Sequence, residues 1–590
     1  MSAAREDTFL PTPDGSPAAN GRRGLHPAWL IAPGAAFLFV LMVFPVMQLL
    51  SVSLRDPVAG TWTWTAYSKI FATGLYLRIL ATTFALAIET TALSLILGYP
   101  LAYWLARKSQ TGNSLVILLA LIPFWASSLI KNFVWLVLLG RAGAAIKIAV
   151  WLGARPSTEL LYHHATVLFA MVGTMLPGAV ITMLPTMLKV DRQLPQAAAT
   201  LGASNAHAFW RVFFPLSMPG VAAAGLLVLV VSLGFFVTPA LLGGPRETMI
   251  GQVVISQILA LHNWPFGAAL ASILIITTLI ACLIYNRLFG LTATPGAARG
   301  DRRSPARRAG AALLKGIAAA QVAFLERPLR RSASASSAWP LNAYAALIVI
   351  VLFLPIIALL PMAFTTSSFL SFPPPLFTAK WFSAYAQSPV WIAATLRSFG
   401  IGAACAFLTF LITFPAAYGV ARTGGRIATA AFLLFMAPMI IPSIGLSLAL
   451  FYLLSQLKLV ATDIGIILGH TVLAIPSVFV IALATMKSYD WRLNDAAATL
   501  GANRWRTTLH VTLPLMKGGL LASMIFAFLL SFDELTVVMF VGAGFKTTLP
   551  KQMWDGIQLQ LDPTLAAASV FVLLIVIVLF LVAERLQPRK

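Results

Sequence analysis

Long apolar stretches with few charges recur along this chain of 590 residues, and short polar segments separate them. A bilayer core about 30 Å thick requires ~20 apolar residues per helix, which most of these stretches provide. In the first half, helices are expected at roughly 28–50, 78–105, 114–139, 162–187, 219–242 and 267–288. In the second half, they are expected at roughly 341–363, 395–420, 428–455, 463–486, 518–542 and 565–584. The pattern therefore predicts an all-α polytopic membrane protein with about 12 transmembrane helices.

Composition supports this fold class and excludes others. Hydrophobic residues make up 59% of the chain and charged residues only 10%, against about 25% charged residues in soluble domains. The formal net charge of +23 does not indicate nucleic-acid binding, because Lys and Arg gather in short loops and form no basic face with interleaved aromatic residues. Cys282 and Cys405 fall in apolar stretches, so neither a disulfide nor a metal site is expected.

Polar segments divide the chain into four expected parts. Residues 1–27 are polar and rich in Pro, Gly and Ala, which is typical of a disordered cytoplasmic tail. Residues 28–290 and 341–586 are expected to form two domains of six helices each. Residues 291–340 between them form a basic linker, with nine Lys or Arg residues against two acidic ones. Counting helices from this linker places both termini and the loops with basic clusters in the cytoplasm.

One polar segment occurs twice. Ala197–Ala203 returns letter for letter as Ala496–Ala502, and 11 of 25 positions are identical between residues 196–220 and 495–519. Because loops usually diverge, this retention favours a contact with something outside the membrane, although an inherited connector is the alternative. A second match at the end of each expected second helix has the same orientation in both halves. The chain is therefore predicted to be a parallel repeat of two six-helix units.

The repeated segment predicts a helix, a turn and a second short helix. Ala-Ala-Ala-Thr-Leu favours a helix, and Gly202 and Gly501 then supply its end. The second stretch is expected to end at Pro215 or Pro514, just before the next membrane helix. We expect this unit to lie along the cytoplasmic membrane face, where its small alanines let another protein approach closely.

This pattern resembles the EAA loop of ABC importer permeases, in which Glu-Ala-Ala is followed by a Gly and later by Pro-Leu and Pro-Gly. The matching residues are Gln196, Ala197, Ala198, Gly202 and Pro215 in the first copy, and Asp495, Ala496, Ala497, Gly501 and Pro514 in the second. Gln196 and Asp495 replace the leading Glu, and Gly518 replaces a proline. In that family the loop forms a coupling helix that docks in a groove of the ATP-hydrolysing subunit. The resemblance implies a type I ABC importer transmembrane fold in the bacterial inner membrane.

The resemblance also implies partners. Two coupling loops in one chain imply two ABC ATPase subunits, and an importer of this class receives its cargo from an extracytoplasmic solute-binding protein. No Gly-x-x-x-x-Gly-Lys-Ser/Thr phosphate-binding loop occurs in the sequence. ATP and Mg²⁺ are therefore expected on the partner subunits, and the chain itself is expected to hold no cofactor and to be no enzyme.

Two further stretches are similar to the permeases of spermidine/putrescine-type importers. Phe236–Pro245 with Asn263–Gly267 is similar to one such permease, and Ser531–Glu534 with Thr548–Pro550 is similar to the other. The chain thus resembles a fusion of both permeases, which implies a polyamine or a related small cationic amine as cargo. Importers of opines, aminoethylphosphonate or ferric iron share these stretches and remain alternatives. A 12-helix secondary transporter is less favoured, because it has no reason to keep two matched cytoplasmic loops.

Two acids distinguish the halves. Asp533 and Glu534 are expected in the middle of the eleventh helix, where the first half has Gly234 and Phe235. A carboxylate within the bilayer costs several kcal/mol unless it faces water or a partner, as in a pathway for a cationic amine. An internal ion pair or hydrogen bonds to helix ends fit equally well. Phe235, which can stack on an amine, and Glu89 are further candidates for the pathway.

Overall fold

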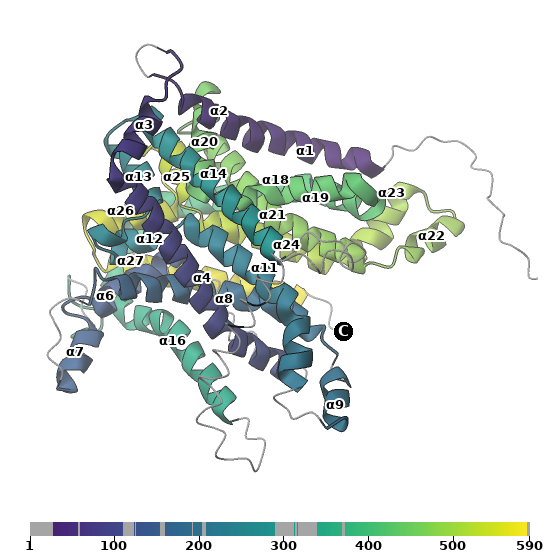
Figure 1. The fold of residues 1–590 in the computed structure, drawn as a ribbon, viewed down its shortest axis with the longest axis horizontal. Coiled ribbons are helices and arrows are strands. Elements are labelled where there is room, and N and C mark those ends of the chain that lie inside the picture. Colours follow the sequence, from purple (N-terminus) through teal and green to yellow (C-terminus); the bar gives the residue numbers. More distant parts are fainter. Residues whose placement is uncertain are drawn as a thin grey trace, which may run out of the picture.

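The described part of the chain is mostly helical, with long and short helices (Figure 1). The computed structural model describes residues 27–56, 60–109, 123, 126–153, 160–191, 193–202, 208–289, 312, 316, 339–368 and 372–586. Among these residues, ten helices are long and apolar enough to cross a membrane, and a helix pair bent by 99° adds an eleventh candidate. Within the same residues, β-structure is limited to two isolated bridges. The predicted all-α polytopic membrane fold is thereby confirmed.

The membrane-spanning helices of the first half follow the apolar stretches. They are Pro27–Val52 (which contains α1, Ala32–Leu38, and α2, Phe44–Val52), α4 (Gly74–Ser109), α6 (Ser128–Leu139) with α7 (Ala144–Trp151), α8 (His164–Leu188), α11 (Phe214–Leu233) with the π-helical turn Phe209–Phe213 before it, and α14 (Trp264–Phe289). Shorter helices lie between them: α3 (Thr65–Ala72), α9 (Gln193–Thr200), α12 (Val237–Leu242) and α13 (Ile250–Ile255).

The second half repeats this order. Its long helices are α16 (Trp339–Ala363), α18 (Pro389–Thr423), α19 (Gly425–Ile440), α20 (Ser443–Gln456), α21 (Asp463–Ser488), α24 (Leu513–Asp533) with α23 (Arg504–Thr507) and the π-helical turn Thr508–Thr512 before it, and α27 (Thr564–Leu586). Its shorter helices are α17 (Lys380–Gln387), α22 (Arg492–Thr499), α25 (Thr536–Val541) and α26 (Leu549–Leu559). The expected tail 1–27 and linker 291–340 fall almost entirely outside the described residues, so the proposed domain limits stay a prediction.

Three of the expected helices are not continuous. The stretch 428–455 is broken between α19 and α20, which meet at the 99° bend. The stretches 219–242 and 518–542 end early, at Leu233 and Asp533, and resume as the short helices α12 and α25. Hydropathy misses such breaks because the apolar character continues across them. Of the expected third helix, 114–139, the structure describes Pro123 and the residues from Ala126 onward.

Pro215 and Pro514 do not end a helix, contrary to the expectation from sequence. The helix runs through each proline, because the turn before it is a π-turn in both halves. The backbone N–H of Phe214 donates to the Phe209 carbonyl, and that of Leu513 donates to the Thr508 carbonyl. A proline ring clashes with the carbonyl four residues earlier in an α-helix, and the wider π-turn moves that carbonyl away. The helical turn before each proline therefore continues without interruption into α11 or α24.

The two halves interlock through their first helices. The Pro27–Val52 segment packs on the second half, where Leu38 and Met42 join a core cluster with residues of α19, α20 and α21. In return, α16 packs on the first half, and its Tyr344 hydroxyl donates to the Leu97 carbonyl at 2.6 Å. Figure 1 shows α1 beside α18 and α19. Each half therefore completes the core of the other.

Candidate functional site

The two repeated segments begin in the same way. The Asp191 carboxylate accepts a hydrogen bond from the Gln193 backbone N–H at 2.9 Å, and Asp490 accepts one from the Arg492 N–H at 3.1 Å. These bonds satisfy an N–H group at the start of α9 and of α22 that has no partner inside the helix. Sequence reasoning missed both acids, although they lie 299 residues apart, the offset of the repeat.

The two segments also end in the same way. Gly202 has a φ of 85° and Gly501 a φ of 82°, a left-handed conformation that residues with a Cβ rarely adopt. In the second copy, the Gly501 N–H donates to the Ala498 carbonyl and the Ala502 N–H to the Ala497 carbonyl, both at 3.0 Å. This is the Schellman pattern that closes a helix. The predicted helix ends at the two glycines are confirmed.

Each segment exposes a large apolar side chain directly before its glycine. Leu201 is 89% exposed and Leu500 is 88% exposed, and both occupy the same place in the repeat. Of the residues matched to the EAA loop, Gln196, Ala197, Asp495 and Ala496 are exposed, Ala198 is half-buried and Ala497 is buried. Large apolar side chains held in the open by a rigid turn are typical of a protein–protein contact.

The later part of the repeat has a structural role. A Cβ added to Gly220 would lie 2.8 Å from the Thr186 side chain, and one added to Gly519 would meet the hydroxyl of Thr485. Thr186 and Thr485 are equivalent residues of α8 and α21. The glycines let α11 and α24 approach these helices closely, next to Pro215 and Pro514 in the first turns. The repeat thus divides into an exposed helix and a buried helix crossing.

The acidic pair lies at a helix break. The first break, residues 234–236, separates α11 from α12, and the second break, residues 534–535, separates α24 from α25. Asp533 is the last residue of α24, so the expected position in the middle of a helix is wrong. The same break occurs at the same offset in both halves and therefore belongs to the architecture rather than to the acids.

Glu534 acts as a helix cap. One of its carboxylate oxygens accepts hydrogen bonds from the Thr536 N–H at 2.7 Å and from the Val537 N–H at 3.1 Å. These are the first amides of α25, where the helix dipole also favours a negative charge. In the first half, Phe235 takes the place of Glu534, and its side chain cannot accept a hydrogen bond from the start of α12. The hydrogen-bonding alternative left open by the sequence therefore describes Glu534.

Asp533 faces the other half of the molecule. The residue is exposed, and it lies close to the Ser127 side chain and the Ser128 backbone at the start of α6. It also interacts electrostatically with Lys131, one turn further along α6. Lys131 is only 5% exposed, and its ammonium donates to the Pro123 carbonyl at 3.2 Å. Sequence reasoning missed Lys131, although a lone lysine in an apolar helix is itself a signal.

Glu89 and Phe235 have other surroundings. The Glu89 carboxylate lies 2.6 Å from Nε2 of His164, and both side chains are about half exposed. This pair links α4 to the start of α8. Phe235 is partly buried and packs against the large core between the halves. Nearby, Phe236 and Trp554 stack edge to face, and this contact also joins the two halves.

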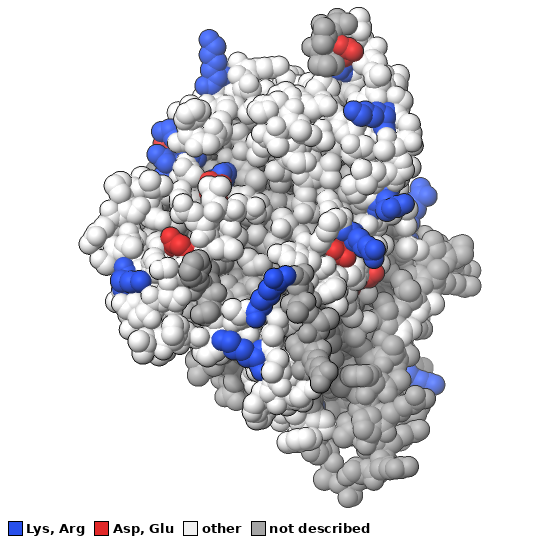
Figure 2. All heavy atoms as spheres, turned by 90° about the vertical axis from the view of Figure 1, so that its left-hand side faces the viewer, with Lys and Arg blue, Asp and Glu red and all other residues white. Residues whose placement is uncertain are grey.

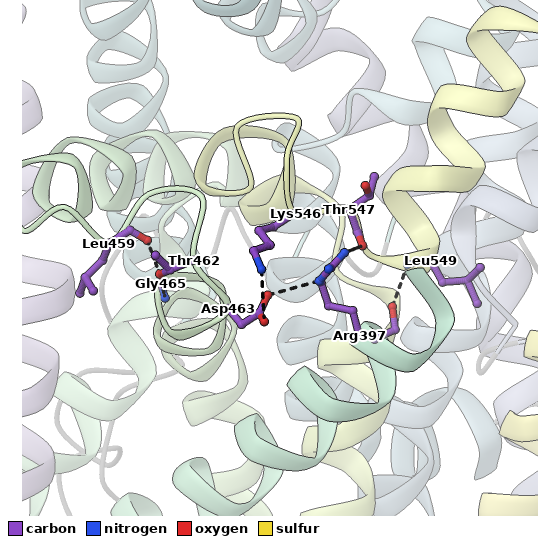
Figure 3. A network of polar contacts seen from close by, with 9 residues as sticks. Arg397, Leu459, Thr462, Asp463, Gly465, Lys546, Thr547 and Leu549 are labelled. Atoms are coloured by element: carbon purple, nitrogen blue, oxygen red, sulfur yellow. Dashed lines mark hydrogen bonds and ion pairs between the residues drawn. The ribbon is translucent and has the colours of Figure 1, made fainter. Parts of the chain in front are cut away.

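A polar network in the second half ties three elements together (Figure 3). Asp463, in the first turn of α21, lies 3.3 Å from Nε of Arg397 and 3.8 Å from Nζ of Lys546. Arg397 also donates to the Thr547 carbonyl at 3.0 Å, and the Leu549 N–H donates to Ser398 Oγ at 2.7 Å. The network joins the loop before α26 to α18 and α21.

Among the described residues, the end of the molecule that carries α3, α13 and α26 shows no cluster of acidic side chains (Figure 2). Figure 2 shows this face as mostly uncharged, with separate Lys and Arg groups and fewer Asp and Glu groups. The segments α9 and α22 lie toward the opposite end in Figure 1.

Comparison with known proteins agrees with these features. Residues 91–292 and residues 410–590 each match the family described as binding-protein-dependent transport system inner membrane component. The spermidine/putrescine transport system permease protein PotB of Salmonella typhimurium is 33% identical over 255 residues, which cover 42% of this chain and 88% of that protein. The sulfate transport system permease protein CysT of Synechocystis is 24% identical over 257 residues, covering 43% of this chain and 85% of that protein.

One solved structure is also similar. It is a bacterial ABC transporter involved in the import of the acidic polysaccharide alginate, with a TM-score of 0.39 and 18% sequence identity. The match covers 45% of this chain and 96% of that one. The same family occurs twice along the chain, as the internal repeat predicts.

Proposed function

Because this chain belongs to the family of binding-protein-dependent transport system inner membrane components, and so is a permease component of an ABC importer, we propose that it imports a small cationic amine. Both domains of the permease are present in one chain. Two ATPase subunits would therefore suffice to complete the motor. A solute-binding protein would deliver the cargo from the opposite side of the membrane.

The repeated segments support the docking of two ATPases. Each presents an exposed leucine, Leu201 or Leu500, on a helix that is closed by a left-handed glycine. Each precedes, within a few residues in sequence, a π-turn that continues into a membrane helix, so we propose that a movement of α9 or α22 passes to α11 or α24. We propose that ATP binding draws the two segments together and thereby alternates access to the pathway.

The cargo proposal rests mainly on Asp533. It is an exposed carboxylate at a helix break within the bundle, and PotB proteins are named for spermidine and putrescine transport. A carboxylate in that place favours a cationic solute over an anion. CysT, another relative of this chain, is named for sulfate, so similarity alone does not fix the cargo. Opines, aminoethylphosphonate and ferric iron remain the alternatives.

The other pathway candidates have different roles in this proposal. Glu534 shapes the break by capping α25, and Phe235 lines the matching break of the first half. Glu89 is held by His164 and contributes to the outer part of the pathway. We place α9, α22 and both termini in the cytoplasm, as the distribution of basic residues predicts.

Uptake by cells that carry the complete transporter tests the proposal. Labelled putrescine, spermidine, an opine, aminoethylphosphonate and ferric iron are offered separately, and ATP-dependent uptake of a polyamine is expected. Leu201→Asp with Leu500→Asp should reduce uptake by about thirtyfold or more, because it places charges in the centre of two interfaces. Leu559→Asp is the control, because Leu559 is 80% exposed on another element, α26. Equal effects of both changes would contradict docking, and uptake of another solute alone would overturn the cargo.

A further inference from the structure

The two helix breaks form the same contact twice. A Cβ added to Gly234, at the first break, would lie 3.5 Å from both the backbone nitrogen and Oγ of Ser443, the first residue of α20. At the second break, Asp533 occupies the place of Gly234 and lies close to Ser127 and Ser128 at the start of α6. Ser128 and Ser443 are equivalent in the two halves, at an offset of 315 residues. Each break therefore lies against the start of a helix from the opposite half.

The two copies of this contact differ in charge. The first copy consists of Gly234, Ser443 and, one turn along α20, the fully buried Leu446. The second copy has Asp533 in place of Gly234 and Lys131 in place of Leu446. Residues three apart share a helix face, so Ser128 and Lys131 both face the break. The second copy of the contact therefore contains both an acid from the second half, Asp533, and a base from the first half, Lys131.

Asp533 and Lys131 differ in solvent exposure. Lys131 is buried, and its ammonium has three protons but one hydrogen-bond acceptor recorded among the described residues, the Pro123 carbonyl. A buried ammonium is costly unless a negative charge compensates it, and Asp533 supplies that charge. Asp533, in contrast, is exposed. A second cation can therefore approach Asp533.

We propose that Lys131 is a tethered counter-ion that holds Asp533 in the cargo-free state and joins the two halves, until an ammonium group of the cargo replaces it. The lysine side chain ends in a primary ammonium, the same group that ends an alkyl diamine. A carboxylate that binds the lysine ammonium can also bind the ammonium of a diamine, whereas Asp533 repels an anionic solute. The chemical identity of the cargo in this proposal rests on the proposed function, but the link between the halves does not.

A double-mutant cycle tests the link without any cargo. Lys131→Met, Asp533→Asn and the double variant are compared by thermal unfolding of the purified full chain. Neighbouring opposite charges that interact are expected to be non-additive by roughly twofold to 150-fold in the unfolding equilibrium constant. Leu446→Met is the matched control, because it makes the equivalent change in the uncharged copy, and it should be additive with Asp533→Asn. Additive effects of Lys131→Met and Asp533→Asn would overturn the link.

A charge exchange tests the replacement by cargo. Lys131→Asp with Asp533→Lys should recover the stability lost in the single variants, because the opposite charges still meet. Uptake of putrescine should remain lost, because the only carboxylate of the pair is then buried. Recovery of both stability and uptake would overturn cargo replacement and reduce the pair to a structural link. If the link holds in the cycle but the unaltered transporter takes up no polyamine, the proposed function fails and the link stands.

ATP hydrolysis gives an independent measure in the complete transporter. Lys131→Met should raise hydrolysis in the absence of cargo by roughly fivefold or more, since the state that Lys131 stabilises is weakened. Leu446→Met should leave hydrolysis unchanged. Equal hydrolysis in Lys131→Met and in the unaltered protein would contradict a role for Lys131 in the cargo-free state.

Discussion

The repeated segments α9 and α22 and the two helix breaks follow the same internal repeat, yet they differ in how far the halves have diverged. In α9 and α22, the capping aspartate, the left-handed glycine and the exposed leucine are all kept in both copies. At the breaks, the backbone path is kept and the charges are not. Two identical ATPase subunits would require two equivalent docking segments. A single small cargo that passes between the halves would require a charged contact in only one of them.

The largest expected effect is a difference in polyamine uptake between two variants, each of which neutralises one acid of the second break. Asp533→Asn should lower polyamine uptake about 10- to 150-fold, since a charge-assisted contact contributes about 1.5–3 kcal/mol. Glu534→Gln should keep most of the uptake, because the amide oxygen of glutamine still accepts from the Thr536 and Val537 amides. Transport assays at matched expression measure both. Equal losses would remove the distinction between pathway acid and cap.

Adding a methyl group at the repeated helix crossing should destabilise both halves, and the second more. A Cβ at Gly519 is closer to Thr485 than a Cβ at Gly220 is to Thr186. Overpacking of this kind costs about 1–3 kcal/mol, so Gly519→Ala should lower the melting temperature further than Gly220→Ala. Thr485→Ala should rescue Gly519→Ala and not Gly220→Ala. Unchanged melting temperatures would show that the crossing relaxes freely.

The left-handed glycines should respond equally in the two halves. Gly202→Ala and Gly501→Ala each force a Cβ into the left-handed region, at a cost of about 1–2 kcal/mol. Coupled ATP hydrolysis should fall by a similar factor in each variant. Gly400→Ala is the control, because Gly400 lies within α18 with nothing within 4 Å of its Cβ position. A clear difference between the two halves would indicate that only one segment is coupled to ATP hydrolysis.

The ion pairs of the second half outside the break should matter least. Asp463→Asn removes the partner of Arg397 and Lys546, whose side chains are 24% and 35% exposed. Exposed pairs of this kind contribute about 0–1 kcal/mol, so the melting temperature should change by a few degrees at most. The difference should shrink as the salt concentration rises, because salt screens exposed charges. A larger loss would mean that the network holds the loop before α26 in place.

Much of the fold and of the repeated segments was predictable, for local reasons. Apolar length determines whether a stretch can span the bilayer, so the long helices follow from the sequence. A glycine after a run of helix-forming residues determines where α9 and α22 end. The exposed leucines were not predicted, because exposure depends on which neighbours surround a residue and not on its own type.

The site at the second break was predictable only in part. The sequence identified Asp533 and Glu534 as the residues that distinguish the halves, and it placed them wrongly in the middle of a helix. Assigning Glu534 to a cap required the turn that brings its carboxylate to the Thr536 amide. Lys131 was missed because it lies about 400 residues away in sequence and reaches Asp533 only when the halves are packed together.

By itself, the sequence determined that this chain is a membrane protein made of two related halves, since hydropathy and internal repeats are read directly along the chain, and its resemblance to a known family implied a permease. Only the tertiary structure decided which residues of one half meet those of the other. It placed the Pro27–Val52 segment against the second half, and it brought the start of α6 to the break after Asp533. Such contacts arise from close packing between distant segments, and no local pattern encodes them.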